Sequence, residues 1–369
     1  MNPEPSHLRL SRRAFLRFTA AAGIAAAGGY ALAEYTPWLD YAGQAAQIWQ
    51  PTGEEATVSP NMRELVRYAT LAANGHNTQP WQFAIRADGI EIHPDYSRHL
   101  PVVDPNNREL WISLGCALEN LLLAARAAGY AAEVTYPDAA DFIDVRLATA
   151  TPQGSPLFDA IPLRQNTRSV YDGQPVKPPV LAQVLAVPLE PGVAVQLITE
   201  PASMERTLEY VRQGNLAQYA DQAFLNELIH WLRFNKKEAL ASLDGLYSRC
   251  SGNPEVPRWL GRMFVSGTRP HQQADVDAAK LRSSAGALVI ASEADTKTAW
   301  VRTGQVYERL ALAMTSLDIK SAFLNQPIEV SSLRGQFQRA IGLGSSLPQL
   351  LVRFGYVGAM PRSLRRPVE

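Results

Sequence analysis

The stretch 71–83 reads LAANGHNTQPWQF and joins a helix-like run, RELVRYATLAA, to a strand-like run, FAIRADGIEIHP. A connecting loop needs few special side chains, because one glycine can bend it and one proline can restrict its backbone. This loop nevertheless places Asn77 and Gln79 beside the large aromatic Trp81. Two interpretations fit the loop alone: its polar side chains close a helix end around a packed tryptophan, or they form part of a binding site.

The composition of the whole chain excludes some classes of function. Its 369 residues are 46% hydrophobic and 19% charged, which is typical of a globular protein with one large or two medium domains. The formal net charge is zero, from 35 basic and 35 acidic residues. We therefore expect no nucleic acid as a partner, and a small molecule or a protein is favoured instead.

The first 33 residues have the pattern of an export signal. Paired arginines in SRRAFLR (11–17) precede a weakly apolar run of alanine and glycine (19–33) that ends in ALA. A charged start, a short apolar middle and a small-residue end are typical of a secretory signal, and the arginine pair indicates the twin-arginine route. The sequence predicts export by the twin-arginine translocation machinery to the periplasm or another extracytoplasmic space. The run is too short for a stable membrane span, although an uncleaved signal would act as a weak anchor.

The cysteines and histidines give no sign of a metal site. Cys116 lies in a long apolar run where a buried thiol is common, so two separate cysteines, Cys116 and Cys250, are favoured over a disulfide. The six histidines are scattered along the chain, and no Cys/His cluster has the spacing of metal ligands. We expect no metal.

Two long helix-like runs resemble each other. The run 108–130 is apolar around nearly its whole circumference, which predicts a buried helix. It aligns with the run 298–319 so that Gly115 matches Gly304, and strand-like sequence follows both runs. A chance likeness between helices rich in leucine and alanine stays open beside a true repeat. A true repeat would make the chain two related halves with a ligand site at their seam.

The segment Leu163–Arg168, LRQNTR, carries the groups of a phosphate site. Arg164 and Arg168 stand on either side of Asn166 and Thr167. Guanidinium groups offer paired donors to phosphate oxygens, and the amide and hydroxyl can fill the remaining acceptors. For the hexapeptide alone, a solvated helix start with Asn166 or Thr167 as its cap is the favoured interpretation. The C-terminal sequence PRSLRRPVE adds a second group of arginines that could converge on the same phosphate.

Taken together, these segments resemble the nitroreductase superfamily, an α+β fold that binds FMN, and specifically its Acg-like branch. The resemblance spans about Met62–Val368 and rests on the order and spacing of several motifs. These motifs are GHNTQPW (75–81), DPNNRELWISLGCALENLLLAA (104–125), LRQNTRSVYDG (163–173), ELIHWLRF (227–234) with the later DGL (244–246), FLNQPIEV (323–330), PQLLVRFGY (348–356) and RRPVE (365–369).

The resemblance implies one bound FMN and the residues that hold it. In the family, an Arg-x-Ser-x-Arg segment and a C-terminal arginine bind the phosphate, and an Asn-x-Gln-Pro-Trp segment contributes to the flavin site. The implied phosphate ligands are Arg164, Asn166 in place of the serine, Thr167, Arg168, and Arg366 or alternatively Arg365. The implied flavin ligands are Asn77, Gln79 and Trp81. No catalytic residue is expected, because the flavin carries the redox chemistry and the protein binds and orients it.

The resemblance also implies an architecture. Ordinary members are homodimers with FMN at the interface, and the Acg-like branch resembles such a dimer fused into one chain. We therefore expect a monomeric pseudo-dimer with a helical, lid-like insertion. The expected parts are the signal (1–33), a surface linker (34–59), a first half (60–157), and a second half (158–369) with the insertion at about 218–264.

Three functions remain open on this basis. The first is an exported FMN-dependent oxidoreductase that passes electrons to a small-molecule acceptor or an unknown redox partner. The second is a flavin-binding or flavin-sequestering protein that a closed lid keeps from turning over. The third is an interaction scaffold without cofactor, against which the retained arginines argue.

Overall fold

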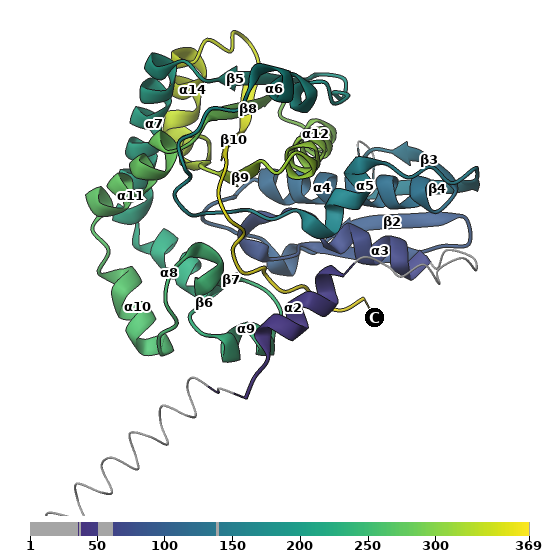
Figure 1. Cartoon of the computed structure of the whole chain (residues 1–369), viewed down its shortest axis with the longest axis horizontal. Coiled ribbons are helices and arrows are strands. Elements are labelled where there is room, and N and C mark those ends of the chain that lie inside the picture. The colour runs from purple at the N-terminus through teal and green to yellow at the C-terminus, as the bar shows by residue number, and fades with distance from the viewer. Residues whose placement is uncertain (1–35, 37, 51–61, 138–139, 369) are drawn as a thin grey trace, which may run out of the picture.

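The computed structural model describes residues 36, 38–50, 62–137 and 140–368, and the predicted signal segment (1–33) lies outside them. The described chain is an α+β protein built around two antiparallel sheets, as Figure 1 shows. Each sheet has four strands, and one long helix accompanies each sheet.

The first sheet contains four strands in the order β1-β2-β4-β3. They are β1 (Trp81–Ile85), β2 (Gly89–Pro94), β3 (Tyr130–Thr135) and β4 (Ile143–Thr149). Helix α3 (Met62–Thr70) precedes them, and helix α4 (Arg108–Ala127) lies between β2 and β3 in the chain. Alternating residues Ile90 and Ile92 of β2 are fully buried, because successive side chains of a strand point to opposite faces.

The second sheet follows the same path. Its strands are β5 (Val193–Ile198), β8 (Gly286–Ser292), β9 (Lys320–Phe323) and β10 (Leu347–Gly355). Their order is β5-β8-β10-β9, and helix α12 (Lys297–Ser316) lies between β8 and β9. Strand for strand, this is the order of the first sheet, with the long helix at the same point of the chain path. All residues of β8 are buried, as its uninterrupted apolar sequence predicts.

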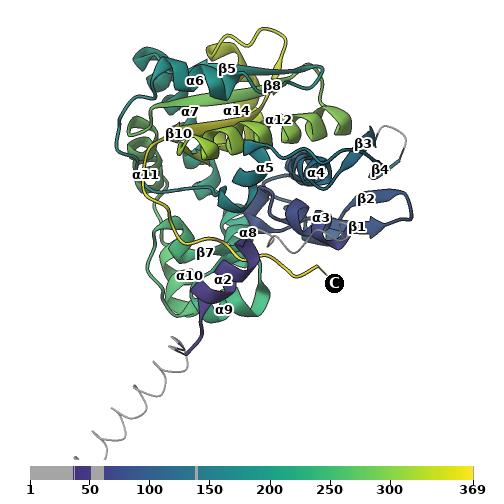
Figure 2. The same cartoon turned by 45° about the vertical axis from the view of Figure 1, so that its right-hand side comes forward.

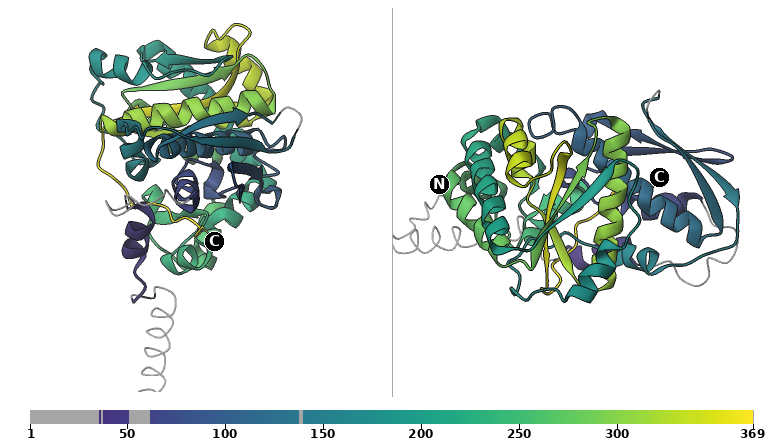
Figure 3. Two further views of the ribbon diagram at one scale, coloured as in Figure 1. Left: turned by 90° about the vertical axis from the view of Figure 1, so that its right-hand side faces the viewer. Right: turned by 90° about the horizontal axis from the view of Figure 1, so that it is seen from above.

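The two long helices pack against each other in the middle of the molecule, and residues of both sheets share their hydrophobic core (Figure 2). A Cβ atom on Gly115 would lie 2.0 Å from the carbonyl oxygen of Val301. A Cβ atom on Gly304 would lie 2.0 Å from the carbonyl oxygen of Ile112. The contact is reciprocal, since each glycine lies against the residue that stands three positions before the other glycine in the sequence. Figure 3 shows α12 directly against α4, with the second sheet on the far side of α12.

Helix α4 is buried on all sides, as predicted. It is the one helix of the described chain that is long and apolar enough to cross a membrane. However, 83% of its most apolar window is buried inside the protein, so α4 is a core helix.

A helical segment is inserted between β5 and β8, where the first half has a tight turn between β1 and β2. It contains α7 (Pro201–Ala220), α8 (Gln222–Trp231), β6 (Leu232–Arg233), α9 (Lys236–Ser242), β7 (Leu246–Tyr247), η4 (Ser248–Ser251), α10 (Arg258–Ser266) and α11 (Pro270–Arg282). Helices α7 and α11 lie beside the second sheet, and α8, α9 and α10 extend away from it (Figure 1). The extending part overlaps residues 218–264, and their role as a lid-like insertion stays a prediction.

The shorter elements connect these parts. They are α2 (Tyr41–Trp49), η1 (Gly75–Asn77), η2 (Tyr96–Arg98), α5 (Pro156–Ala160), η3 (Ile161–Leu163), α6 (Pro178–Leu185), α13 (Gln326–Glu329) and α14 (Ser331–Ala340). Helix α2 lies within the predicted surface linker, and its Trp49 is buried.

The two ends of the described chain meet. After β10 the segment 356–368, here called the C-terminal arm, runs back to the first half beside α2 (Figure 1). The indole Nε1 of Trp49 donates to the carbonyl oxygen of Ser363 at 2.8 Å. The hydroxyl of Tyr41 donates to the carbonyl oxygen of Arg362 at 2.6 Å. The arm therefore ties the second half to the first.

Candidate functional site

A main cavity of about 620 Å³ lies between the first half, the insertion and the chain after β9. The polar loop contributes Asn74 and His76, and the insertion contributes the aromatic side chains of Phe234 and Phe264. Its volume falls in the range of about 300–1,000 Å³ that is usual for sites of small molecules and cofactors. The cavity thus lies where the polar loop meets the insertion and the chain after β9.

A small cavity of about 40 Å³ adjoins the main cavity, and Arg168 lines both. The small cavity brings together five of the predicted FMN ligands from three separate parts of the sequence. These are Asn77, Arg164, Asn166, Arg168 and Arg365. A cavity needs roughly 10–15 Å³ to hold one water molecule, so this one admits a group of several heavy atoms.

Arginines dominate the lining of the small cavity, and the described residues that line it include no carboxylate. The four arginines are Arg164, Arg168, Arg362 and Arg365. Burial lowers the pKa of Arg365 to about 9, and the charge of Arg164 is the next cause. Burial also lowers the pKa of Arg168 and of Arg362. The buried carboxylate of Glu308 offsets part of this positive charge, since it lies 2.9 Å from Nε of Arg164. The cavity therefore has a surplus of buried positive charge.

Arg164 and Arg365 use their donors on the protein itself. Arg365 donates to the carbonyl oxygens of Thr70 and Ala72 at 2.8 and 3.2 Å. Arg164 donates from Nη2 to the carbonyl oxygen of Leu71 at 2.9 Å. The last carbonyls of a helix have no partner within it and carry partial negative charge. These two arginines therefore cap the end of α3.

Arg168 differs from both. Its guanidinium forms no ion pair or hydrogen bond with the residues that the structure describes. It lies near His76, where burial and then the charge of Arg168 lower the histidine pKa to about 4. His76 is thus neutral at pH 7, and Arg168 is a cation with unused donors at the junction of the two cavities.

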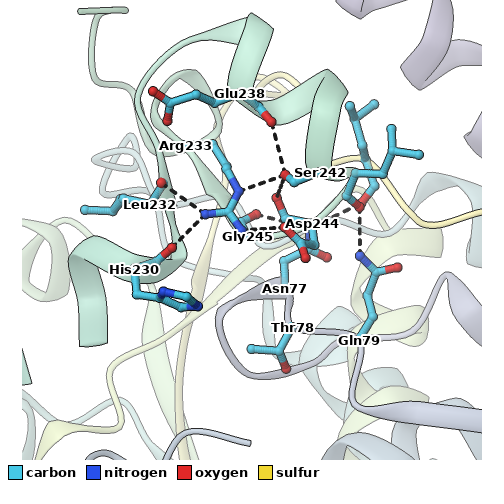
Figure 4. A network of polar contacts seen from close by, with 12 residues as sticks. Asn77, Thr78, Gln79, His230, Leu232, Arg233, Glu238, Ser242, Asp244 and Gly245 are labelled. Atoms are coloured by element: carbon cyan, nitrogen blue, oxygen red, sulfur yellow. Dashed lines mark hydrogen bonds and ion pairs between the residues drawn. The ribbon is translucent and has the colours of Figure 1, made fainter. Parts of the chain in front are cut away.

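The side chain of Asn77 fastens the polar loop to the insertion and to the C-terminal arm. Its Nδ2 donates to the carbonyl oxygens of Gly245 and Leu364 at 3.1 and 3.2 Å. Its Oδ1 accepts from Nη1 of Arg365 at 2.8 Å. Figure 4 shows Asn77 beside the turn that contains Asp244 and Gly245. All the hydrogen-bonding atoms of the Asn77 side chain are thus engaged within the protein.

Gln79 makes an equivalent connection. Its Nε2 donates to the carbonyl oxygen of Leu243 at 2.9 Å, and its Oε1 accepts from the backbone N–H of Arg366 at 2.8 Å. Nη2 of Arg366 also donates to the backbone carbonyl oxygen of Gln79. Both Asn77 and Gln79 have a φ of +54°, a conformation that asparagine adopts more readily than most residues.

The turn in the insertion is built to receive these contacts. Gly245 has a φ of +74°, and a Cβ there would lie 2.4 Å from the carbonyl oxygen of Trp231, so glycine is required. Nη2 of Arg233 holds Asp244 at 2.5 Å, and Nη1 of Arg233 donates to the carbonyl oxygen of His230 at 2.8 Å (Figure 4). The DGL motif thus anchors the insertion on the polar loop.

Four predicted ligands lie outside the lining of both cavities: Gln79, Trp81, Thr167 and Arg366. Trp81 is buried in the hydrophobic core. Thr167 is also buried, and its backbone N–H donates to the carbonyl oxygen of Ser321 at 3.0 Å. The contribution of each predicted ligand to FMN binding stays a prediction.

The acidic wall of the main cavity was not predicted from the sequence. Glu109 and Glu329 line it, and Nη2 of Arg108 lies 2.8 Å from Oε1 of Glu109. Burial and then the charge of Glu329 raise the pKa of Glu109 well above its ordinary value of 4.5. In the sequence Glu109 stands in the first turn of a helix, where the helix dipole stabilises a carboxylate. Nothing in the sequence therefore marked Glu109 as a residue that lines a cavity.

The cysteines behave as predicted. Cys116 and Cys250 are both buried and free. The thiol of Cys116 donates to the carbonyl oxygen of Gly304 at 3.4 Å. Among the described residues, no group of three or more histidine, cysteine, aspartate or glutamate side chains could hold a metal ion.

Comparison with known proteins gives relatives along most of the chain. No protein-family model matches it. A protein of Mycobacterium tuberculosis that is named as an NAD(P)H nitroreductase is 27% identical over 303 residues, which cover 80% of this chain and 85% of the relative. The NAD(P)H nitroreductase named acg from the same organism is 25% identical over 322 residues, covering 84% and 94%. These relatives support a place for the chain in the nitroreductase superfamily.

Solved structures of lower similarity also align. The FMN-dependent nitroreductase NfnB of Mycobacterium smegmatis, in complex with NADPH, is 14% identical with a TM-score of 0.37, covering 55% of this chain and 87% of that one. A nitroreductase with bound FMN from Bacteroides fragilis is 15% identical with a TM-score of 0.35, covering 56% and 90%.

Proposed function

We propose that the chain is an FMN-binding oxidoreductase of the nitroreductase type, and that Arg168 binds the phosphate of FMN in the small cavity. The observation that carries the proposal is the surplus of buried positive charge there. Among the residues that the structure describes, four arginines and no carboxylate line the cavity, and Arg168 has unused donors. The names of the two relatives, both NAD(P)H nitroreductases, agree with this function.

The residues present fit a phosphate group. A guanidinium donates two parallel hydrogen bonds to phosphate oxygens, and such charge-assisted bonds are about twice as strong as neutral ones. A bound anion would also offset the charge that burial makes costly at Arg168 and Arg365. Asn166 lines the same cavity and adds an amide. Arg164 and Arg365, which are occupied by α3, contribute charge to the site.

The main cavity fits the rest of the nucleotide and a small acceptor. It meets the small cavity at Arg168 and combines polar walls with the aromatic rings of Phe234 and Phe264. When bound, FMN supplies reversible transfer of one or two electrons. Burial raises the pKa of Glu109 at the cavity wall well above its ordinary value, and the aromatic rings of Phe234 and Phe264 line the same cavity.

The pseudo-dimer is part of the proposal. The equal strand order of the two sheets and the reciprocal contact of Gly115 with Gly304 support two related halves within one chain. A fused pair of halves needs no second copy to form a site at their seam, so we propose a monomer. We further propose export by the twin-arginine route, on the strength of the paired arginines in SRRAFLR (11–17) and the apolar run after them.

One observation favours a second function, flavin binding without turnover. The insertion forms a wall of the main cavity, and Asn77 and Gln79 fasten it at Gly245 and Leu243. A lid held in this way would retain FMN and exclude a nicotinamide donor. The first function requires an electron donor and an acceptor that reach the flavin, and the second requires neither, whereas the phosphate site is the same in both.

Flavin titration of the full chain tests the proposal. FMN and riboflavin are added separately to the protein, and the quenching of flavin fluorescence gives each Kd. We expect Arg168→Gln to weaken FMN binding by about tenfold to a hundredfold, because it removes a charge-assisted contact worth roughly 1.5–3 kcal/mol. Riboflavin has no phosphate, so its Kd should stay unchanged. Arg146→Gln, at an exposed arginine of β4, is the matched control.

The outcomes separate the candidate functions. Equal FMN affinity in the Arg168→Gln variant and the unchanged protein would refute the phosphate assignment, and no flavin binding at all would refute both flavin functions. For the flavin-loaded protein, anaerobic bleaching by NADPH followed by reoxidation with a nitroaromatic supports the oxidoreductase. Bleaching by dithionite but not by NADPH rules out the use of NADPH as donor and favours retention without turnover.

A further inference from the structure

The outer face of α10 gathers three large apolar side chains in solvent. Trp259 is 61% exposed, Met263 is 55% exposed and Phe264 is 57% exposed. Figure 1 shows α10 at the periphery of the molecule, on the outer side of α8. Large apolar side chains scattered singly over a surface need no explanation, but a group of this kind marks an interaction site.

The orientation of α10 is set from its inner side. A Cβ on Gly261 would lie 2.1 Å from Cδ1 of Phe234, so the helix sits directly on that ring and only glycine allows the approach. Phe234 lines the main cavity, and so do Phe264 and Val265 of α10 itself. The helix is thus at once a wall of the cavity and an outer surface of the protein.

The segment around α10 is positively charged. Residues 256–274 contain Arg258, Arg262 and Arg269 and no aspartate or glutamate. Arg258 pairs with Glu238 at 2.9 Å. Arg262 and Arg269 are exposed and form no ion pair or hydrogen bond with the described part of the chain. Two cations with unused donors therefore flank the exposed tryptophan, methionine and phenylalanine.

We propose that α10 docks the protein on an anionic lipid surface. A helix of this kind lies in the plane of the membrane interface, with its apolar side chains among the acyl chains and its basic residues at the headgroups. Tryptophan suits this boundary, because its ring is apolar and its N–H is polar. Each arginine near an anionic surface strengthens binding roughly fivefold. The positive charge complements lipid phosphates, which is why we favour a membrane over a protein partner.

Docking would place the main cavity beside the lipid, since Phe264 belongs both to the exposed face and to the cavity lining. A ligand that is dissolved in the membrane could then reach the cavity without crossing bulk water. This consequence concerns access to the cavity and leaves the docking proposal independent of which ligand the cavity holds.

Vesicle flotation with the full chain tests the proposal. The vesicles are phosphatidylcholine alone or phosphatidylcholine with phosphatidylglycerol. We expect the protein to float with the anionic vesicles, and the Trp259→Gln, Met263→Gln, Phe264→Gln triple variant to bind at least tenfold more weakly. The double variant Arg262→Gln, Arg269→Gln should lose most of its preference for the anionic lipid. The apolar run 19–33 is present in every variant, so the differences report on α10.

Matched controls use exposed residues elsewhere. Val170→Gln with Leu189→Gln removes two exposed apolar side chains, and Arg146→Gln removes an exposed arginine. All three substitutions should leave flotation unchanged, and circular dichroism checks that each variant is folded. Flotation of the triple variant equal to that of the unchanged protein would overturn the proposal. A second result would also overturn it. If the unchanged protein self-associates in sedimentation, and the triple variant loses this self-association but floats as before, α10 is a protein interface.

Discussion

Gly115 and Gly304 face each other where α4 packs on α12, and each lies against the backbone of the other helix. Glycine is the residue that permits this distance, because any Cβ would meet a carbonyl oxygen. One turn further along the two helices, Glu119 and Glu308 are both buried and each forms an ion pair with an arginine. The two helices thus repeat one another in packing and in buried charge.

Alanine at either glycine should therefore destabilise the protein. We expect Gly115→Ala and Gly304→Ala each to lower the free energy of unfolding by about 1–3 kcal/mol, because the added methyl group forces the helices apart. Urea denaturation measures the effect. Gly154→Ala is the control, since a Cβ at Gly154 has no heavy atom within 4 Å. Equal stability of the Gly115→Ala and Gly154→Ala variants would show that the helices do not approach so closely.

Glu109 should make stability fall with rising pH. Its pKa is raised in the folded protein, so the unfolded chain loses this proton first as the pH rises above the ordinary value of 4.5. The stabilisation that the proton provides is complete below that pH and is lost as the pH rises through the folded pKa. We expect Glu109→Gln, which resembles the neutral acid, to flatten the decline of Tm over this range. Glu133→Gln, at an exposed position, should follow the unchanged protein.

His76 should report anion binding at Arg168. Its pKa of about 4 contributes to a loss of stability as the pH falls from 6.5 towards 4, because only the unfolded chain takes up the proton there. A phosphate bound at Arg168 offsets one cause of the shift, so we expect FMN to raise the pKa of His76. NMR titration of the imidazole measures this, with His76→Gln used to assign the signal. An identical pKa with and without FMN would place the phosphate elsewhere.

Asn77→Ala should loosen the insertion. The change leaves the carbonyl oxygen of Gly245 without its side-chain donor, removes one of two side-chain donors from the carbonyl oxygen of Leu364, and removes an acceptor from Arg365. Each unmatched buried group costs roughly 1–3 kcal/mol. Hydrogen–deuterium exchange should therefore become faster in peptides that cover the DGL motif and the C-terminal arm. Asn226→Ala, at an exposed asparagine of α8, is the control. Unchanged exchange would mean that other contacts hold the insertion.

Much of the fold follows from the sequence. The run 108–130 is apolar on all sides, which predicts a core helix, and it forms α4. The alignment of Gly115 with Gly304 anticipated a relationship that the structure displays as a close contact. The full length of the inserted segment was not predicted, because α7 has a weakly amphipathic sequence that does not reveal which sheet it covers.

The candidate site was less accessible to prediction. LRQNTR predicts Arg164 and Arg168 as phosphate ligands alike. The sequence cannot tell that Arg164 turns towards the end of α3, since this depends on where distant segments pass. Asn77 and Gln79 have the donors of ligand-binding residues, and the same donors serve equally well to fasten a turn. The partner of a polar side chain depends on how segments that are distant in the sequence pack together. The local sequence pattern does not contain this information.

Arg365 makes the end of α3 depend on a distant part of the chain. The arginine donates to the carbonyl oxygen of Thr70, which lies 295 residues earlier. All strands of the first sheet come from residues 81–149, so this sheet and the capping arginine belong to separate parts of the sequence. A variant without the Arg365 side chain retains the sequence of every described strand and helix and still lacks this closure. The helix of the first half is thus completed only when the C-terminal arm has come to lie beside it.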